Sequence, residues 1–332
     1  MSILIGGPGS SGTTMLRVYV DRNRDIFSGD ELNFFNKKTL YDNWNKNKFK
    51  LLNNNRFFAN STNGWGPSPG SNLLSREYGW TKDEIVSLIK DSRDIKEFTN
   101  NFFKKPLKKS DKKIWVEKTP SNAYCFKEFL DLDESHKVIH MTRHPFDVVL
   151  SYIKRGMSPY FAAGSWIYNN ATALMSEDSD KYILVKYENL VSNQDKEFDK
   201  IYSFINAKNK NILEDSSINK VKNKTKLDAW EYSAEDHIHK DRINSFSRSD
   251  KALQQIIISA LFSFQICDNY ENGKFSSLNT IEKISEKLGY DITFNKEFKI
   301  KGSKIQMWND KIKRTLKFYS TNIFNYPGCM RD

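Results

Sequence analysis

Cysteine and long apolar runs are scarce in this chain of 332 residues. Its three cysteines, Cys125, Cys267 and Cys329, form no C-x-x-C pair, so we expect neither a metal site nor a disulfide framework. No apolar run approaches the roughly 18 residues that a membrane span needs, and no basic-then-apolar signal peptide precedes Ile3. These absences favour a cytoplasmic protein without a membrane span.

Positive charge is in excess, with a formal net charge of +11. A charge of this sign favours anionic partners such as nucleotides, sulfated or phosphorylated molecules, or nucleic acid. The chain is also crowded with lysine and asparagine, so a solvated surface of biased composition explains much of the excess equally well. Because the basic residues are scattered and no nucleic-acid-binding motif accompanies them, we expect no nucleic-acid partner.

A glycine-rich loop follows the first apolar run, residues 2–6. Residues 7–14 have the spacing of the phosphate-binding motif G-x-x-x-x-G-K-[ST], but Thr13 occupies the position of the lysine. In that motif the backbone N–H groups cradle a phosphate chain, and the lysine reaches its β- and γ-phosphates. The loop therefore predicts an anion site at a helix N-terminus that is poorly suited to moving a γ-phosphoryl group.

Short apolar runs alternate with helical patterns along much of the chain. Besides residues 2–6, we expect strands at 113–117, 137–142 and 181–185, and helices at 13–21, at 121–132, from Pro145 onward and at about 198–205. This alternation predicts an α/β fold with a P-loop-like central parallel sheet flanked by helices. Two later amphipathic helices are expected at 253–264 and 278–288.

The regular pattern weakens between residues 34 and 112, where asparagine, lysine and aromatic residues are frequent. A helix at 81–90 with a capping box is the clearest element expected there. We interpret this stretch as an insertion that shapes a substrate site, with a surface excursion as the alternative. The predicted organisation is one α/β domain over residues 1–270, including the insertion at about 34–112, and a C-terminal extension or subdomain over 271–332.

Polar residues follow the predicted strands, at the edge where parallel sheets bind ligands. Lys118 follows the second long strand, Arg143 ends the third, and Ser151 comes eight residues after Arg143. Each feature alone has many chance matches. Together with the loop, and in this order, they form a recognisable pattern.

The pattern resembles sulfotransferases that use 3′-phosphoadenosine 5′-phosphosulfate (PAPS), and is nearest to the tyrosylprotein and carbohydrate branches. The family's phosphosulfate loop resembles residues 8–14, its R-x-P-x-D-V-x-x-S pattern resembles residues 143–151, and its Y-E-[DN]-L segment resembles residues 187–190. The resemblance covers about residues 2–270. It implies an enzyme that uses PAPS without a metal ion. It implies that the loop binds the 5′-phosphosulfate, that an arginine and a serine bind the 3′-phosphate, and that a tyrosine lies near the adenine. The implied donor-binding residues are Gly9, Ser10, Ser11, Gly12, Thr13, Thr14, Arg143, Ser151 and Tyr187.

The resemblance also implies two catalytic residues. Glu31 matches the catalytic glutamate of the tyrosylprotein branch and would take the acceptor's proton, for which it needs a partly desolvated site; as an alternative it caps a helix or faces solvent. Relatives often carry arginine or lysine at the position of Ser10, so stabilisation of the leaving group falls to Lys118. Asn33 replaces a family arginine, which counts against a protein-tyrosine substrate. Ser10 and Asn33 together leave open a catalytically inactive relative that only binds nucleotide.

The stretch from residue 230 to 248 resembles the late loop that closes over the nucleotide in this family. Its candidates for phosphate contacts are Ser233, Lys240 and Arg242, and a solvated basic loop is an equally open interpretation. We expect the acceptor to be a carbohydrate or small hydroxyl compound, with a peptide tyrosine as the alternative. A P-loop kinase or a nucleotide-binding module remains the alternative outside the family, although the loop lysine and a strand-end aspartate for magnesium are missing.

Overall fold

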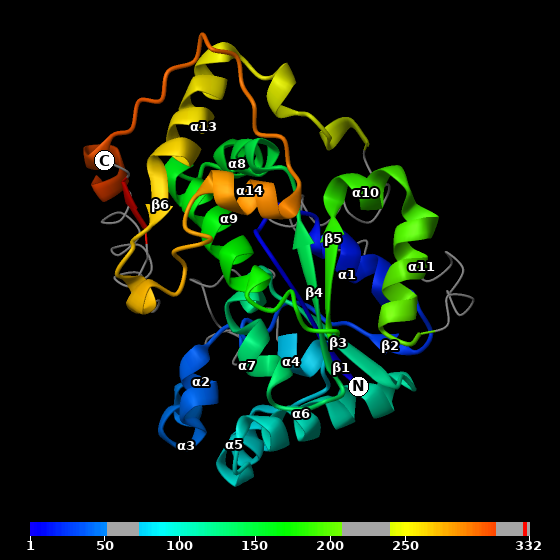
Figure 1. The fold of residues 1–332 in the computed structure, drawn as a ribbon. Coiled ribbons are helices and arrows are strands. Elements are labelled where there is room, and N and C mark those ends of the chain that lie inside the picture. The colour runs from blue at the N-terminus through cyan, green and yellow to red at the C-terminus, as the bar shows by residue number, and fades with distance from the viewer. Residues whose placement is uncertain (52–72, 208–239, 310–327, 331–332) are drawn as a thin grey trace.

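A parallel sheet forms the centre of the structure, a computed structural model that describes residues 1–51, 73–207, 240–309 and 328–330 (Figure 1). Among these residues the sheet has five strands in the order β2-β3-β1-β4-β5. The strands are β1 (Ser2–Gly6), β2 (Ile26–Phe27), β3 (Ile114–Lys118), β4 (His136–Thr142) and β5 (Tyr182–Lys186). The predicted α/β fold with a central parallel sheet is therefore confirmed.

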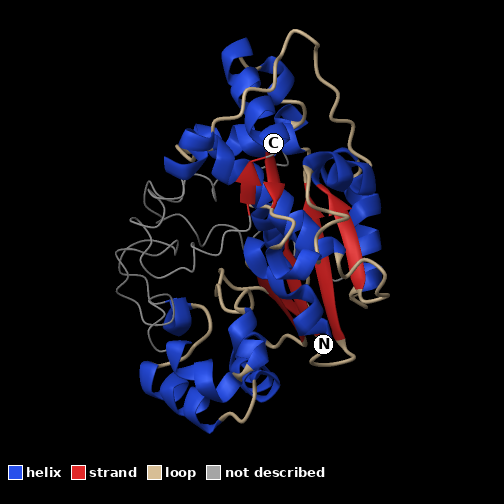
Figure 2. Ribbon diagram, turned by 60° about the vertical axis from the view of Figure 1, so that its left-hand side comes forward, coloured by secondary structure: helices blue, strands red, loops and turns tan. Residues whose placement is uncertain are grey.

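Successive side chains of β1 enter different cores because side chains alternate across a strand. Ile3 and Ile5 pack on one face, in a core shared with α1 (Thr13–Asp21), α10 (Tyr187–Ser192) and α11 (Gln194–Phe204). Leu4 packs on the other face, against the region between β2 and β3 and against α7 (Phe126–Leu130). In the turned view of Figure 2, helices lie on both sides of the strands.

The region between β2 and β3 is mostly helical where the structure describes it. Its elements are α2 (Lys38–Asp42), α3 (Trp44–Asn47), the 3₁₀-helix η1 (Lys48–Leu51), α4 (Leu73–Arg76), α5 (Lys82–Asp91) and α6 (Ile95–Ser110). The expected capping box is present at the start of α5, where Thr81 and Glu84 bond to each other's backbone N–H groups. In Figure 1, α5 and α6 lie at the opposite end of the molecule from α13.

The remaining helices build a third core beside the sheet. They include α8 (Pro145–Lys154), α9 (Pro159–Leu174), α13 (Lys251–Ser263) and α14 (Ile281–Leu288). Short elements complete the described chain: the 3₁₀-helices η2 (Pro120–Cys125), η5 (Lys240–Arg242), η6 (Phe246–Arg248) and η7 (Tyr270–Gly273), and the antiparallel pair β6 (Phe264–Ile266) and β7 (Gly328–Met330). In the part of the chain that the structure describes, no helix has both the length and the apolar character of a membrane span.

Several elements differ from the sequence expectation, and α6 is among the helices that were not expected. The helix expected at 121–132 is divided into η2 and α7, and the two-residue strand β2 was not expected. The long helix α9 was also missed, because nearly all of its residues from Tyr160 to Leu174 are buried and it shows no polar face. The domain division remains a prediction, although α14 shares its core with α8 and α9.

Aromatic stacking attaches the insertion to the sheet. The ring of Phe103 on α6 lies parallel to Trp115 on β3, with ring centroids 3.9 Å apart and an interplanar angle of 7°. Phe103 is 1% exposed and Trp115 3% exposed. Because Trp115 lies three residues before Lys118 on the same strand, α6 packs directly against the strand that carries a predicted catalytic residue.

Replacing Phe103 with alanine therefore tests this attachment. We expect Phe103→Ala to lower the free energy of unfolding by about 3–5 kcal/mol, since it leaves a cavity against Trp115. Phe49, whose side chain is 47% exposed, provides the control, and Phe49→Ala should change stability by less than about 0.5 kcal/mol. Urea unfolding followed by tryptophan fluorescence measures both, and equal effects would show that Phe103 does not anchor the insertion.

Candidate active site

The glycine-rich loop connects the end of β1 to α1. Gly7 has a φ of +140°, and a Cβ there would lie 1.9 Å from the carbonyl oxygen of Met141, so only glycine fits. Gly12 is the N-cap residue of α1 and has a φ of +87°. Because glycine has no side chain, no side-chain hydrogen bond caps this end of the helix. The first N–H groups of α1 therefore have no side-chain cap, as an anion site at a helix N-terminus requires.

The loop also holds a buried polar atom that lacks a partner. Ser11 is fully buried, and its hydroxyl has no hydrogen-bond partner within the described part of the chain. Thr13, which occupies the position of the lysine in the phosphate-binding motif, is 3% exposed. An unpaired buried hydroxyl is costly, and an oxygen of a bound phosphate would satisfy it.

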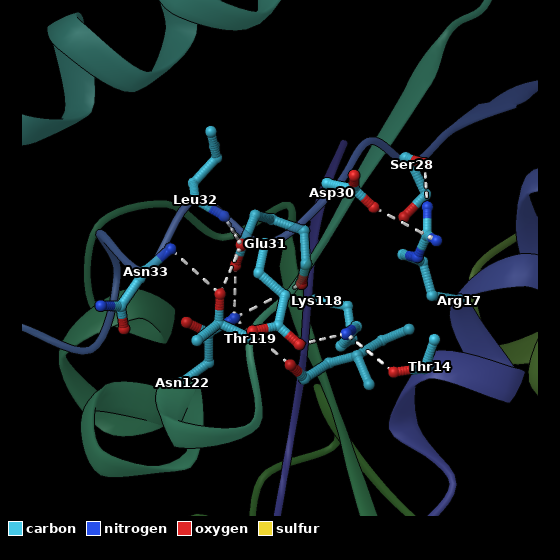
Figure 3. A network of polar contacts seen from close by, with 12 residues as sticks. Thr14, Arg17, Ser28, Asp30, Glu31, Leu32, Asn33, Lys118, Thr119 and Asn122 are labelled. Atoms are coloured by element: carbon cyan, nitrogen blue, oxygen red, sulfur yellow. Dashed lines mark hydrogen bonds and ion pairs between the residues drawn. The ribbon is translucent and has the colours of Figure 1, made fainter. Parts of the chain in front are cut away.

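Lys118 and Glu31 meet beside this loop (Figure 3). The Lys118 ammonium donates to the Glu31 carboxylate and, over 3.1 Å, to the hydroxyl of Thr14. The Lys118 side chain is 3% exposed and that of Glu31 is 20% exposed. The structure thus brings both predicted catalytic residues to the loop and leaves the Glu31 side chain only partly exposed.

Neighbouring backbone bonds hold Glu31 in place. The Leu32 N–H donates to Glu117 Oε1 over 2.9 Å, and the Asn33 N–H donates to Thr119 Oγ1 over 3.1 Å. Glu117 is fully buried, and burial raises the pKa of its carboxyl despite hydrogen bonds from Asn122, Leu32 and Thr119. The sequence analysis missed Glu117 as a positioning residue, although an acidic residue inside an apolar strand run was a visible signal.

Arg143 approaches the loop from the end of β4. One of its Nη atoms donates to the Ser10 carbonyl over 3.3 Å, and the other lies 3.4 Å from Asp147. The guanidinium also lies 4.7 Å from the ring centroid of Tyr187, and burial raises the pKa of that tyrosine. Arg143 Nε is buried without a hydrogen-bond partner in the described residues. The predicted residues Arg143, Ser10 and Tyr187 therefore lie together.

The other predicted donor-binding residues are less closely placed. Ser151 is half-buried on α8, and within the described chain its hydroxyl makes no hydrogen bond with Arg143. The backbone carbonyl of Arg242 accepts a bond from Arg143, while the side chains of Lys240 and Arg242 are exposed. Ser233 lies outside the described residues. In the described ranges, no group of three or more histidine, cysteine or acidic residues is placed to hold a metal ion.

Comparisons with solved structures identify proteins of similar fold. The sulfotransferase domain from the Synechococcus PCC 7002 olefin synthase is 18% identical, with a TM-score of 0.56 over 88% of this chain and 95% of that chain. The sulfotransferase domain from the curacin biosynthetic pathway is 17% identical, with a TM-score of 0.50 over 88% of this chain and 98% of that chain. These similarities show a shared fold.

A search of curated proteins found no match. A family model described as "Sulfotransferase family" matches residues 2–210, more than half of the sequence. Together with the fold, this match shows that the chain belongs to the sulfotransferase family of enzymes.

Proposed function

We propose that the enzyme moves the sulfuryl group of PAPS to a hydroxyl, or an amine, of a carbohydrate or small-molecule acceptor. The observation that carries the proposal is the contact of Lys118 with both Thr14 of the loop and Glu31. It puts a cation and a carboxylate side by side at the edge of an anion site. Sulfuryl transfer needs this combination, because one group must stabilise the leaving oxygen and another must take a proton.

The residues at the loop fit such a donor. The buried hydroxyl of Ser11 and the uncapped N-terminus of α1 suit the 5′-phosphosulfate. The unpaired Nε of Arg143, behind the same loop, suits a second anionic group such as the 3′-phosphate. Tyr187 is 4% exposed beneath Arg143 and borders Gly12, which supports the predicted adenine position.

The proposed reaction is an in-line displacement at sulfur. Glu31 accepts the proton of the acceptor hydroxyl as its oxygen forms a new bond to sulfur. The bond between sulfur and the bridging oxygen breaks, and that oxygen keeps the electron pair as part of adenosine 3′,5′-bisphosphate. Lys118, held at Thr14, donates a hydrogen bond to the oxygen on which this charge develops.

The insertion supports the proposed acceptor position. The hydroxyl of Tyr78 donates to the Asp30 carbonyl over 2.7 Å, and the Asp30 N–H donates to Glu77 over 2.7 Å. The insertion therefore contacts the residue next to Glu31, where an acceptor hydroxyl must arrive. A carbohydrate or small hydroxyl compound is the proposed acceptor, and peptide tyrosine is the alternative, disfavoured by Asn33 in place of a family arginine.

Donor binding is tested with adenosine 3′,5′-bisphosphate, the proposed product. At a hundredfold excess over its Kd it should stabilise the folded chain by about 2.7 kcal/mol, which raises the unfolding temperature by about 4 °C for this length. Adenosine 5′-monophosphate, which lacks the 3′-phosphate, should raise it less at equal concentration. An unchanged unfolding temperature with the bisphosphate would contradict the proposed donor.

Glu31→Gln tests the base while keeping the side chain's size. With ³⁵S-labelled PAPS and an acceptor found by screening sugars and hydroxyl compounds, we expect kcat to fall at least about 100-fold. The Kd for the bisphosphate should stay within about threefold, because Glu31 does not bind the donor in this mechanism. The control is Glu134→Gln, a 98% exposed glutamate before β4; wild-type turnover in Glu31→Gln would remove Glu31 as the base.

Lys118→Gln should differ from Glu31→Gln, because it should impair both catalysis and binding of the bisphosphate. Loss of the ammonium should lower kcat by about 10²–10³ and also weaken bisphosphate binding by about tenfold. Lys112→Gln is the control, since Lys112 pairs with Asp21 before the start of β3 and should leave both quantities near wild type. A Lys118→Gln enzyme with normal kcat would assign leaving-group stabilisation to another residue.

A further inference from the structure

Residues 28–31 form the segment that carries Glu31, and we call it the base segment. The guanidinium of Arg17, on α1, lies 3.4 Å from the Asp30 carboxylate and donates over 3.4 Å to the carbonyl oxygen of Ser28. The side chains of Arg17 and Asp30 are only 12% and 7% exposed. Because solvent and salt screen such a pair little, this contact ties the base segment to α1.

The helix α1 also takes part in the candidate donor site. Its N-terminus follows the glycine-rich loop, and Thr14 in its first turn accepts a hydrogen bond from Lys118 over 3.1 Å. Arg17 comes three residues after Thr14, so the two side chains are neighbours on the surface of the helix. In Figure 3, Asp30 points toward Arg17, and Glu31 points toward Lys118. One helix thus contacts both the proposed donor site and the base segment.

Tyr78 contacts the base segment from the insertion. Its hydroxyl donates to the Asp30 carbonyl oxygen over 2.7 Å, and a Cβ on Gly29 would lie 2.6 Å from the same hydroxyl oxygen. Tyr78 is fully buried, and its ring packs edge-on against Phe27 with the centroids 5.5 Å apart. Burial raises the pKa of Tyr78 well above its usual value, so the hydroxyl stays protonated and donates at neutral pH. The insertion thereby holds the backbone next to Glu31.

Folding stability alone is a weak explanation for the contact between Arg17 and Asp30. A mostly buried ion pair adds little net stability, because the desolvation of both charges offsets their attraction. The pair does fix orientation, since a planar guanidinium that contacts a carboxylate and a carbonyl oxygen sets their relative positions. This property matters most where the neighbouring residue must present its side chain in one direction.

We propose that Arg17 and Tyr78 are positioning residues, which hold the base segment so that the Glu31 carboxylate faces the hydroxyl of the acceptor. The inference rests on the proposed function, because it takes Glu31 as the base. Arg17 fixes Glu31 relative to α1 and therefore to the donor. Tyr78 gives the insertion a second role, in which it positions the base as well as shaping the acceptor site.

Tyr78→Phe tests the proposal with the loss of a single oxygen atom. The control is Tyr202→Phe, because Tyr202 is 2% exposed and its hydroxyl also donates to a backbone carbonyl, that of Tyr19, over 3.3 Å. With ³⁵S-labelled PAPS and the compound that the wild-type enzyme sulfates fastest in the acceptor screen, kcat should fall about tenfold in Tyr78→Phe. Tyr202→Phe should keep kcat near wild type, and both variants should keep the wild-type Kd for adenosine 3′,5′-bisphosphate.

Glu31→Gln separates positioning of the base from a general structural effect. If Tyr78 acts through Glu31, adding Tyr78→Phe to Glu31→Gln should leave the residual kcat unchanged within about twofold. The same tenfold loss in both backgrounds would overturn the proposal. Arg17→Gln should follow the same pattern as Tyr78→Phe, and Arg17→Lys, which keeps the charge, should retain more of the wild-type kcat.

Amide hydrogen exchange of the base segment, followed by mass spectrometry, needs no acceptor. Exchange should be faster in Tyr78→Phe than in the wild type or in Tyr202→Phe, because one of the bonds that hold the segment is lost. Unchanged exchange, or wild-type kcat in both Tyr78→Phe and Arg17→Gln, would overturn the proposal and leave the proposed function intact. A wild-type chain that neither binds the bisphosphate nor transfers the label would instead refute the proposed function.

Discussion

The buried carboxylate of Glu117 is the constraint on which the candidate site depends. It is fully buried and accepts bonds from the Leu32 N–H, the Thr119 hydroxyl and the Asn122 amide. A buried carboxylate is tolerated only when such donors surround it, so these bonds fix the chain after Glu31 against the end of β3. Lys118 is the next residue on that strand, and the pairing of Lys118 with Glu31 follows from this arrangement.

Sequence patterns predicted the elements whose formation depends mainly on residues that are neighbours in the chain. The run at residues 2–6, the loop and the helix from Thr13 to Asp21 correspond to β1, the glycine turn and α1. The loop, Lys118 and Arg143 were predictable because strand ends collect at one edge of a parallel sheet. Tyr187 came from the family resemblance. Glu31 came from the family resemblance, and the structure adds its contact with Lys118. The catalytic roles of Glu31 and Lys118 remain predictions.

Other features depend on contacts between distant parts of the chain. α6 contains Pro106 and many lysines, and its buried face, which includes Phe103 packed on Trp115, stabilises it against the sheet. Two of the three donors to Glu117, Thr119 and Asn122, are near it in the sequence, but the Leu32 N–H comes from a segment 85 residues earlier. The approach of Arg155 to Ser10 spans two elements with no shared motif. Such pairings follow from tertiary structure, which single-sequence patterns do not contain.

The position of β1 at the centre of the sheet also affects how the chain folds. Ser2 pairs with Trp115 of β3 and with His136 of β4, both more than a hundred residues later. At synthesis rates of about 5–20 residues per second, β1 leaves the ribosome on the order of ten seconds before its neighbours exist. Nucleation of the sheet must then close long chain segments, which is slow for parallel strands. During this interval the apolar first strand is unpaired, which makes it a potential site of aggregation.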